Sequence, residues 1–469
     1  MVVWFRDDLR IADHPALAAA AETGSPLICL YVFEEGAEIR SLGGASRWWL
    51  AGSLRALDTA LRVHGQRLLL RKGKASTIIP PLAAEVGATT VHCTRRYGAP
   101  ERAVDTDVAN NLLTQGATLR VHTGALLFEP EALHTDAGRP ARVYAAFKRR
   151  LQAAGPPRGP MPAPRVLPPP YPVLKSDALD SWQLEPRMPD WAGGLRDAWQ
   201  PGEAGAQAAL ADFVQTRLRD YTTARDRVDD LGSSQLSPHL RFGELSPSQI
   251  WHAVNNAKPR SGADKFLSEL AWRDFSYHQL TEFPDMATRN LRDGFDAFPW
   301  RDDPQALRAW QRGETGYPII DAAMRELWIT GWMPNRLRMV TASFLVKHLL
   351  IDWRRGEQWF WNTLIDADPA NNAINWQWVA GSGIDSTPYF RIFNPILQAQ
   401  KIDPNGDYVR RWLPELAPLP AKHIHTPWEL SPIELGGLGV TLGRNYPEPI
   451  VDHAQARQRA LAALRSMRE

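Results

Sequence analysis

The segment from residue 366 to residue 378 has the composition of a binding site rather than of a hydrophobic core. Two carboxylates, Asp366 and Asp368, and three asparagines crowd beside Trp376 and Trp378, and such polar groups are costly to bury without partners. Paired aspartates can form a metal site, an acid/base pair or a hydrogen-bonding cradle for a polar heterocycle. A hard cation needs more oxygen ligands than the segment offers, and no histidine or cysteine cluster supports zinc. The cradle is therefore the favoured interpretation.

Two stretches with helical spacing place charged, amide and ring-bearing side chains on one face. In the first, Glu269, Trp272 and Arg273 stand at i, i+3 and i+4. Alone, this is the pattern of an ordinary helix with a surface ion pair. The same spacing recurs in a second stretch, next to Trp332: Asn335, Arg338 and Met339. Two such faces that meet would form a cavity with hydrogen-bonding groups and a soft apolar floor.

A third candidate is the run of small hydroxyl residues at positions 232–237, which follows Tyr221. Backbone N–H groups and serine hydroxyls at a helix start can hold phosphates without any lysine. Helix capping explains the same residues, so this run is a weak signal by itself.

The elements that must position these residues fall into two patterns. Short β-branched apolar runs alternate with helical segments in the first part of the chain, which predicts a parallel sheet covered on both faces. The predicted strands are residues 2–5, 27–33, 68–70, 90–93 and 119–121, and the predicted helices are residues 15–21, 46–63, 76–86 and 101–113. No Gly-x-Gly-x-x-Gly follows the first strand, which disfavours a dinucleotide site of the dehydrogenase kind.

A different pattern follows. Residues 139–170 carry seven basic and no acidic side chains, and proline fills nine of the 17 positions from 156 to 172, so we expect an extended connector. Its charge fits either a solvated linker or the steering of a polyanion. Beyond residue 200 the pattern becomes helical. The predicted helices there are residues 210–219, 247–255, 263–280, 304–312, 319–330, 336–352 and 357–364.

We therefore predict an α/β N-terminal domain with a parallel, Rossmann-like sheet (residues 1–130), a Pro-rich connector (131–200) and an all-α domain (201–469). The net charge of +2 excludes a basic tail, and two cysteines indicate a reducing compartment. Only 9 of the 54 basic residues are lysine, and tryptophan is abundant at 19 residues. Without a leader or a long apolar stretch, the protein is expected to be soluble and cytoplasmic.

Taken together, these segments closely resemble the flavin-binding core of the photolyase/cryptochrome family. The likeness runs through Tyr221 with residues 232–237, residues 269–275 and 331–348, and above all 366–395, while Trp4 to Arg10 resembles the family's first strand and loop. The resemblance implies an antenna domain of residues 1–130 and an all-α domain that binds FAD in a folded shape. Within the family, the chain is most similar to bacterial photolyases of classes I and III, which repair cyclobutane pyrimidine dimers in DNA.

The resemblance assigns a set of residues to FAD. Those that would hold its phosphates and ribityl chain, or surround its ring, are Tyr221, Ser233, Ser234, Gln235, Leu236, Ser237, Phe266, Arg273, Asn335, Arg338, Asp366, Asp368 and Asn372. Asn372 would face flavin N5, as in photolyases, where plant cryptochromes carry an aspartate. A neutral amide does not readily give a proton to N5, which favours the anionic flavin that repair needs.

The predicted lesion follows from the residues of the same cavity. Family members that act on six-four photoproducts have histidines where this chain has Asn335 and Met339, so acid/base chemistry of that type is absent here. A cyclobutane dimer needs only an electron and its return. Glu269 would hydrogen-bond the base edge of the flipped dimer, while the ring and apolar side chains of Trp272, Met339 and Trp378 pack against it. Two arginines, Arg336 and Arg391, would bind the DNA.

Trp376, Trp353 and Trp300 fall on the positions of the family's electron-transfer triad; core packing is the alternative use of these rings. For the antenna, Glu101 and Trp48 are the candidates, with methenyltetrahydrofolate favoured over a deazaflavin and helix packing as the other role for Trp48. The protein is expected to act as a monomer.

Three rival functions stay open at this point. The first is a cryptochrome-like photoreceptor, disfavoured because signalling members often carry a long C-terminal extension. The second is a six-four photolyase, disfavoured by Asn335 and Met339. The third is a flavoprotein oxidoreductase that works in the dark, for which the site offers no obvious substrate acid or base.

Overall fold

A computed structural model describes residues 1–469 except 37–38, 136–137, 173, 259–260, 386–389 and 468–469. Its contacts group the chain into two compact units. The first unit comprises residues 1–219, 234–284 and 365–368, and the second comprises residues 220–233, 285–364 and 369–469. These units do not follow sequence order, so the division at residues 130 and 200 stays a prediction.

The first unit contains the predicted parallel sheet. Its strands are β1 (Val2–Phe5), β2 (Ile28–Phe33), β3 (Leu68–Lys72), β4 (Thr90–Thr94) and β5 (Thr118–His122). They pair in the order β3-β2-β1-β4-β5, and every pairing is parallel. The central strand β1 is buried along its whole length, as the uninterrupted apolar run predicts for a sheet covered on both faces. The predicted α/β fold is confirmed.

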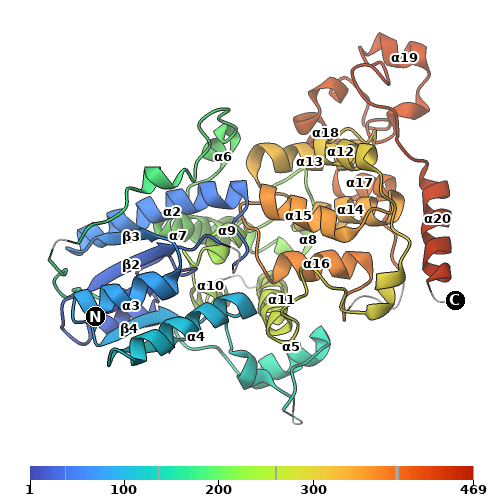
Figure 1. The fold of residues 1–469 in the computed structure, drawn as a ribbon. Helices are drawn as coiled ribbons and strands as arrows, with labels where there is room; N and C mark the ends of the chain where they lie inside the picture. Colours follow the sequence, from blue (N-terminus) through green and yellow to red (C-terminus); the bar gives the residue numbers. More distant parts are fainter. Residues whose placement is uncertain (37–38, 136–137, 173, 259–260, 386–389, 468–469) are drawn as a thin grey trace. The chain divides into compact units, whose positions relative to one another are not determined.

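Helices cover both faces of the sheet (Figure 1). Alternate residues Val2 and Trp4 face a core formed with α3 (Ala75–Glu85) and α4 (Ala99–Leu113). Phe5, on the opposite face, meets the ring of His14, which caps α1 (Pro15–Ala21), with 4.8 Å between ring centroids. On the side away from α3 runs α2 (Gly44–Val63).

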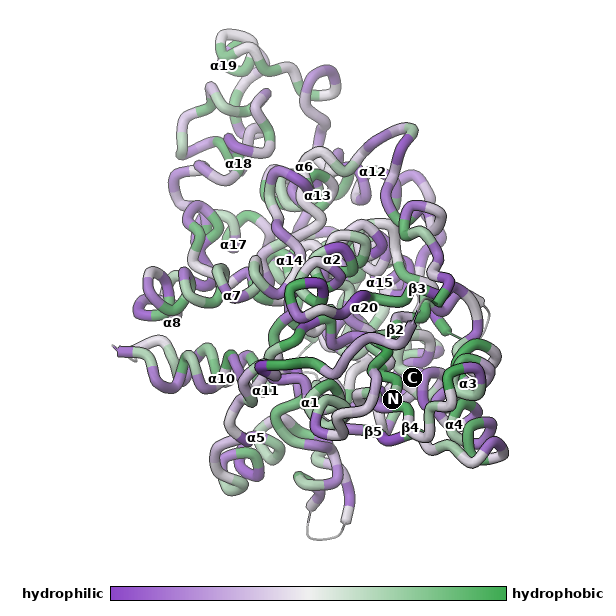
Figure 2. Tube along the Cα trace, turned by 90° about the vertical axis from the view of Figure 1, so that its left-hand side faces the viewer, coloured by the Kyte–Doolittle hydropathy of each residue, from purple (hydrophilic) through white to green (hydrophobic). Residues whose placement is uncertain are grey.

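In its described ranges, the first unit has six further helices. They are α5 (Tyr144–Ala153), α6 (Gly193–Ala198), α7 (Glu203–Asp212), α9 (Ser237–Arg241), α10 (Pro247–Asn255) and α11 (Ala263–Glu282). Short 3₁₀ turns at Pro130–Leu133 and Leu179–Trp182 and a π-helical stretch at Phe213–Arg217 accompany them. The alternation of hydrophobic and hydrophilic residues along α5 and α10 can be followed in Figure 2, and it is the pattern of helices that pack with one face.

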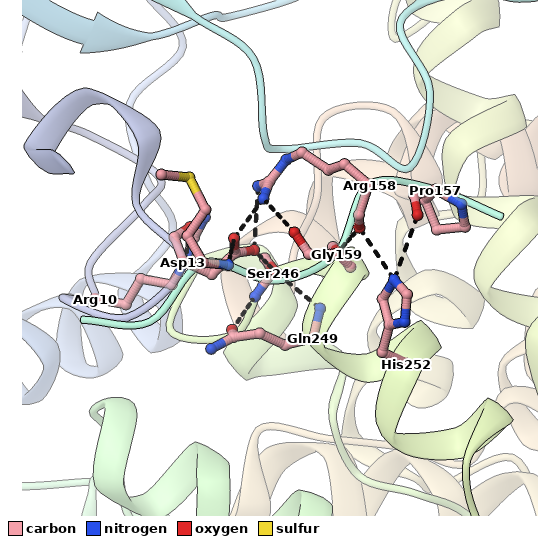
Figure 3. A network of polar contacts seen from close by, with 10 residues as sticks. Arg10, Asp13, Pro157, Arg158, Gly159, Ser246, Gln249 and His252 are labelled. Atoms are coloured by element: carbon pink, nitrogen blue, oxygen red, sulfur yellow. Dashed lines mark hydrogen bonds and ion pairs between the residues drawn. The ribbon is translucent and has the colours of Figure 1, made fainter. Parts of the chain in front are cut away.

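The Pro-rich stretch is fastened to this unit by a network of polar contacts (Figure 3). Arg158 forms an ion pair with the buried carboxylate of Asp13 at 2.5 Å. Asp13 also accepts a hydrogen bond from Ser246, whose hydroxyl caps α10 together with Gln249. His252 on α10 lies 3.1 Å from the backbone oxygen of Arg158. The stretch predicted as an extended connector is in part helical, because α5 and α6 lie within residues 131–200. Its proline-rich part is tied to both the N-terminal loop and α10.

The second unit is helical in the part that the structure describes. Its α-helices are α8 (Tyr221–Ala224), α12 (Pro304–Arg312), α13 (Pro318–Thr330), α14 (Asn335–Ser343), α15 (Trp353–Thr363), α16 (Asn371–Ala380), α17 (Pro395–Ile402), α18 (Asp407–Trp412), α19 (Pro432–Gly437) and α20 (His453–Ser466). Short 3₁₀ turns lie at Asp293–Ala297, Pro414–Leu416 and Pro427–Glu429. This confirms the predicted helical class. None of the helices in the described ranges combines the length and apolar composition needed to span a bilayer.

Some predicted helices have the wrong extent. The helix expected over residues 210–219 is observed as α7 followed by the π-helical stretch Phe213–Arg217, and the helix expected over residues 357–364 begins earlier, as α15 (Trp353–Thr363). The helix expected over residues 336–352 is interrupted: α14 continues as a π-helical stretch, Phe344–His348, and Leu350 has a left-handed backbone with φ of 56°. The side chain of Asp352 then accepts a hydrogen bond from the N–H of Arg354 and starts α15. The apolar periodicity continues across this break, so the pattern alone conceals it.

Candidate functional site

In the first unit, the predicted phosphate loop leads directly into α9. Gln235 has a left-handed backbone (φ of 56°), and Leu236, almost fully buried, precedes the first residue of the helix, Ser237. The orientation of α9 is fixed by the fully buried carboxylate of Glu244, which lies 2.5 Å from Nδ1 of His239. Glu244 also accepts hydrogen bonds from Trp49 Nε1 at 3.1 Å, from the Gly202 N–H at 2.7 Å and from the Ser53 hydroxyl.

The aspartates at 366 and 368 belong to the first unit and are each only 6% exposed. The phenol of Tyr277 donates a hydrogen bond to Asp368 at 2.7 Å. Arg241 binds the backbone oxygen of Ala367 through Nε at 2.8 Å and pairs with Asp7 through Nη1 at 2.8 Å. Burial acts to lower the pKa of Arg241, but the nearby carboxylates of Asp7 and Asp368 outweigh it and raise that pKa. A guanidinium therefore compensates the charge of these carboxylates.

No metal ligand set accompanies these aspartates. The described ranges contain no group of three or more His, Cys, Asp or Glu side chains arranged to hold a metal ion. Neutral and cationic hydrogen-bond donors surround the segment instead, as a cradle for a polar heterocycle requires.

Arg273 on α11 has three contacts, one of them with Asp274, whose carboxylate oxygen lies 3.5 Å from Nη1 of Arg273. Its Nη1 donates to the backbone oxygen of Ala125 at 2.9 Å, and its guanidinium lies 4.9 Å from the ring centroid of Tyr277. The adjacent Asp274 is fully buried and accepts a hydrogen bond from the N–H of Leu127 at 2.6 Å. Burial raises the pKa of Asp274 to about 7. Nearer the start of α11, the predicted flavin contact Phe266 packs on Phe213, with 4.6 Å between ring centroids.

The predicted dimer-binding residues of α11 share one face of the helix. Glu269 pairs with Lys265 one turn earlier at 2.8 Å, which is the surface ion pair that helical spacing alone suggests. Trp272 is half-buried, and Tyr144 from α5 stacks on its indole with 3.5 Å between ring centroids and 8° between planes. The sequence analysis missed Tyr144, because nothing in its spacing links α5 to α11.

In the second unit, the predicted α14 residues lie in one turn. The amide nitrogen of Asn335 is 4.0 Å from the sulfur of Met339. Arg338 donates through Nε to the backbone oxygen of Met333 at 2.8 Å, with its guanidinium 5.9 Å from the ring centroid of Trp332. Asn335 and Met339 are thus side by side, and neither carries a titratable group.

Arg336, Tyr221 and Ser233 also lie in this unit. Arg336 forms an ion pair with Asp226, and the guanidinium of Arg225 lies 5.5 Å from the ring centroid of buried Tyr221. Next to Ser233, a Cβ on Gly232 would lie 2.1 Å from the backbone oxygen of Ala224. Glycine at 232 is therefore what allows the backbone there to lie this close to the backbone of Ala224.

Asn372, at the start of α16, has a defined amide orientation. Its Nδ2 donates to the backbone oxygen of Glu357 at 3.0 Å and to the Glu357 carboxylate at 2.8 Å. Both groups are buried. With the NH2 group engaged on α15, the carbonyl oxygen is the part of the amide that is left to face a ligand. Glu357 is a second residue that the sequence analysis missed.

The three tryptophans proposed as an electron path are all in the second unit. Trp376 is buried against Phe360 and Trp310, at centroid distances of 5.0 and 6.2 Å. Trp353 is fully buried and donates through Nε1 to the Asn290 side chain at 2.9 Å. Trp300 packs on Phe298 at 4.4 Å, at the edge of the core that α20 helps to form.

Gly356 allows the ring of Trp376 to pack against α15, the helix that carries Trp353. A Cβ on Gly356, one turn after Trp353 on α15, would lie 2.1 Å from the Cη2 atom of Trp376. The indole of Trp376 therefore rests directly on the backbone of α15. Packing contacts are present for all three rings, so their role in electron transfer stays a prediction.

Trp378 and Arg391 are the remaining DNA candidates of this unit. Trp378 is half-buried on α16, while Arg391 is exposed, with its guanidinium 5.8 Å from the ring centroid of Phe393. Arg391 follows residues 386–389, which lie outside the described residues.

The antenna candidates are in the first unit, and the ring of Trp48 is not exposed. Trp48 is buried in α2, edge-on to Trp49 at 6.3 Å. The Glu101 carboxylate lies in the first turn of α4, over Gly98, where a Cβ would be 2.0 Å from Oε2. The helix-packing alternative for Trp48 agrees with this burial, and the antenna assignment stays a prediction.

Comparison with known proteins decides the family. A family model described as "DNA photolyase" matches residues 1–166, and one described as "FAD binding domain of DNA photolyase" matches residues 266–466. The chain belongs to the photolyase/cryptochrome family. This family carries an FAD-binding domain, so the flavin half of the predicted cofactors is supported, and the second family model includes the predicted residues from Phe266 to Arg391.

Individual relatives of this photolyase-family chain include both branches of the family. A deoxyribodipyrimidine photo-lyase of Agrobacterium fabrum is 49% identical over 100% of this chain and 98% of the relative. Cryptochrome-1 of Arabidopsis thaliana is 37% identical over 99% of this chain and 70% of the relative. Among solved structures, a class III photolyase from Agrobacterium tumefaciens superimposes with a TM-score of 0.96 at 49% identity, covering 100% of this chain and 97% of the other. A Synechocystis cryptochrome gives a TM-score of 0.91 at 32% identity, covering 99% and 98%.

Proposed function

We propose that this protein is a deoxyribodipyrimidine photolyase that uses FAD and light to split cyclobutane pyrimidine dimers in DNA. The observation that carries the proposal is the buried amide of Asn372, held by two hydrogen bonds from its NH2 group to Glu357. It offers a neutral acceptor at the position predicted to face flavin N5. Full-length similarity to a photo-lyase at 49% identity supports the same function.

The donor set of the chain fits a flavin. Buried carboxylates at 366 and 368 are compensated by Arg241 and Tyr277 in the first unit. Asn372 and Arg338 of the second unit present an amide and a guanidinium. When bound, FAD supplies light absorption and the electron that opens the cyclobutane ring. The protein holds the cofactor, orients the dimer and withholds protons.

The choice of lesion rests on the chemistry that Asn335 and Met339 lack. Asn335 and Met339 are neighbours on α14 and neither can exchange a proton near neutral pH. A six-four product requires such an exchange, whereas a cyclobutane dimer does not. Glu269 would accept a hydrogen bond from the base edge of the dimer, and Trp272, Trp378 and Met339 would supply the apolar contacts.

DNA binding would use cationic side chains outside the lesion contacts. Arg391 is exposed and Arg336 is partly exposed beside Asp226, so both can approach phosphates. Such binding weakens as salt rises, because phosphate contacts release counterions. We further propose that the protein acts as a cytoplasmic monomer of class I or class III type.

For the second chromophore we propose methenyltetrahydrofolate, held near Glu101 and Trp48, with a deazaflavin as the alternative. An archaeal photolyase from Sulfolobus tokodaii with 26% identity and a TM-score of 0.84, covering 99% of each chain, is described with two FAD molecules. Extraction of the chromophores from the purified protein, followed by absorption spectroscopy and mass measurement, identifies the compound. A folate spectrum supports the proposal and a second flavin or a deazaflavin contradicts it.

The repair function is tested with the FAD-loaded, prereduced protein and an oligonucleotide that contains one cyclobutane dimer. Blue light should remove the dimer, and the dark sample should not. A parallel oligonucleotide with a six-four product should remain unrepaired. Persistence of the cyclobutane dimer under light would refute the proposal and favour the photoreceptor alternative.

A further inference from the structure

Helices α5 and α11 of the first unit join through one aromatic pair. The ring of Tyr144 lies parallel to the indole of Trp272, at 3.5 Å and 8°. This geometry is close to face-to-face stacking, so Tyr144 covers one face of the indole. A base can then stack only on the other face of Trp272.

The position of Tyr144 is fixed by more than stacking. Its hydroxyl donates to the backbone oxygen of Ser268 at 2.7 Å and lies 2.8 Å from the Ser268 hydroxyl. Ser268 is one turn before Trp272 on α11. Edge-on contacts with Phe275, at 5.8 Å from Tyr144 and 5.6 Å from Trp272, enclose the pair from the core side. Burial raises the pKa of Tyr144 to about 12, so the phenol keeps its proton.

Two lysines lie on the same two helices as this pair. Nζ of Lys148, one turn along α5 from Tyr144, is 3.5 Å from the Ser268 hydroxyl. Lys265, one turn before Glu269 on α11, is exposed and pairs with that carboxylate. The chain has only 9 lysines, and lysine serves as a point charge for phosphates.

The sequence around α5 adds to this positive charge. Residues 139–170 contain no acidic side chain, and Arg149 is exposed on α5. A flat aromatic group flanked by cations is the arrangement that binds a nucleic-acid strand, since bases stack on the ring while phosphates meet the charges.

We propose that α5 and α11 form a DNA-contact surface in which Tyr144 positions Trp272 for stacking on the lesion, while Lys148 and Lys265 bind adjacent phosphates. This inference rests on the proposed repair function and names a partner surface for it. Tyr144 is a positioning residue, because it acts through Trp272.

The test measures equilibrium binding in the dark by the FAD-loaded protein to two duplexes that differ only in one cyclobutane dimer. Tyr144→Leu keeps apolar volume but removes the flat ring, so affinity for the damaged duplex should fall about tenfold. Affinity for the undamaged duplex should change less than twofold. Tyr144→Phe keeps the stacked ring and should retain most of the preference for damage.

Replacing the lysines should change binding in a different way from replacing Tyr144. Combined Lys148→Gln and Lys265→Gln substitutions should weaken binding to both duplexes alike and reduce the slope of log affinity against log salt by about 2. Lys175→Gln is the matched control, because Lys175 is an exposed lysine of the same unit, and should change neither quantity. The flavin spectrum and the melting temperature verify that each variant is folded.

Each failure has a separate meaning. If the unaltered protein shows no preference for the damaged duplex and no repair, the proposed function and this inference both fail. If the unaltered protein prefers and repairs damage, but Tyr144→Leu keeps the full preference or the double lysine variant keeps the full salt slope, only the α5–α11 surface is refuted.

Discussion

Replacing Gly356 by alanine sets two physical effects against each other on α15. Alanine in a helix is favoured over glycine by about 1 kcal/mol, so propensity alone predicts stabilisation. The added Cβ, however, would lie 2.1 Å from Cη2 and 2.5 Å from Cζ3 of Trp376, and 2.7 Å from a methyl carbon of Leu345. Carbon atoms pack at about 3.5 Å, so the indole must move by more than an ångström.

The buried indole has little room for that movement. Phe360 and Trp310 pack against Trp376 at centroid distances of 5.0 and 6.2 Å. Overpacking of this kind costs roughly 1–3 kcal/mol or more. We therefore expect Gly356→Ala to lower the melting temperature of the FAD-loaded protein by several degrees, because the clash exceeds the gain in propensity. Displacement of Trp376 should also slow photoreduction of oxidised FAD in the same sample.

The control is Gly436→Ala on α19 of the same unit. An added Cβ at Gly436 meets no atom within 4 Å, so only the propensity term applies and the melting temperature should stay the same or rise. Scanning fluorimetry or calorimetry on both variants gives the comparison. An equal or higher melting temperature for Gly356→Ala would refute the close packing of Trp376 on α15.

Three further predictions follow from buried groups. Trp376→Phe should block photoreduction of oxidised FAD, followed by absorption under blue light, yet leave repair by prereduced enzyme nearly intact; unchanged photoreduction would exclude this ring from the path. Glu357→Ala removes the carboxylate partner of Asn372 and should cost about 1–3 kcal/mol in denaturant unfolding, and Glu357→Gln, which keeps an acceptor, should cost less. Asp274 has its pKa raised to about 7 by burial, so the folded state binds an extra proton between about pH 4 and 7 and its stability falls as pH rises through that window. Asp274→Asn should flatten this fall in unfolding free energy measured against pH, and an unchanged slope would argue against the shift.

The sequence predicted those features that depend on local pattern. Strand β1 was predicted at its observed bounds because four consecutive apolar residues open the chain. The break between α14 and α15 was not predicted, since it depends on the capping side chain of Asp352 and the left-handed backbone of Leu350. Neither the cap nor the left-handed residue changes the spacing of the apolar residues, so that spacing could not reveal the break.

The site shows the same limit. The resemblance to the photolyase/cryptochrome family singled out Asn372, but its partner Glu357 lies on another helix and has no fixed offset from it. Tyr144 is far from Trp272 in sequence, so its stacking became visible only in three dimensions. Tyr277 is the exception among the missed residues: it stands at i+4 from Arg273, and helical spacing was sufficient to find it.

The hydrogen bonds and ion pair of Asp13 determine where the chain can be cut into separately expressed fragments. Its buried carboxylate accepts from Ser246 at the start of α10 and pairs with Arg158. A fragment that starts at residue 201 lacks the N-terminal strands and would expose the residues that cap α10. It would also leave the buried carboxylate of Glu244 without two of its hydrogen-bond donors, Trp49 and Ser53. Such a truncation should give insoluble product, whereas two co-expressed halves that are cut within the proline stretch retain every partner and can reassociate.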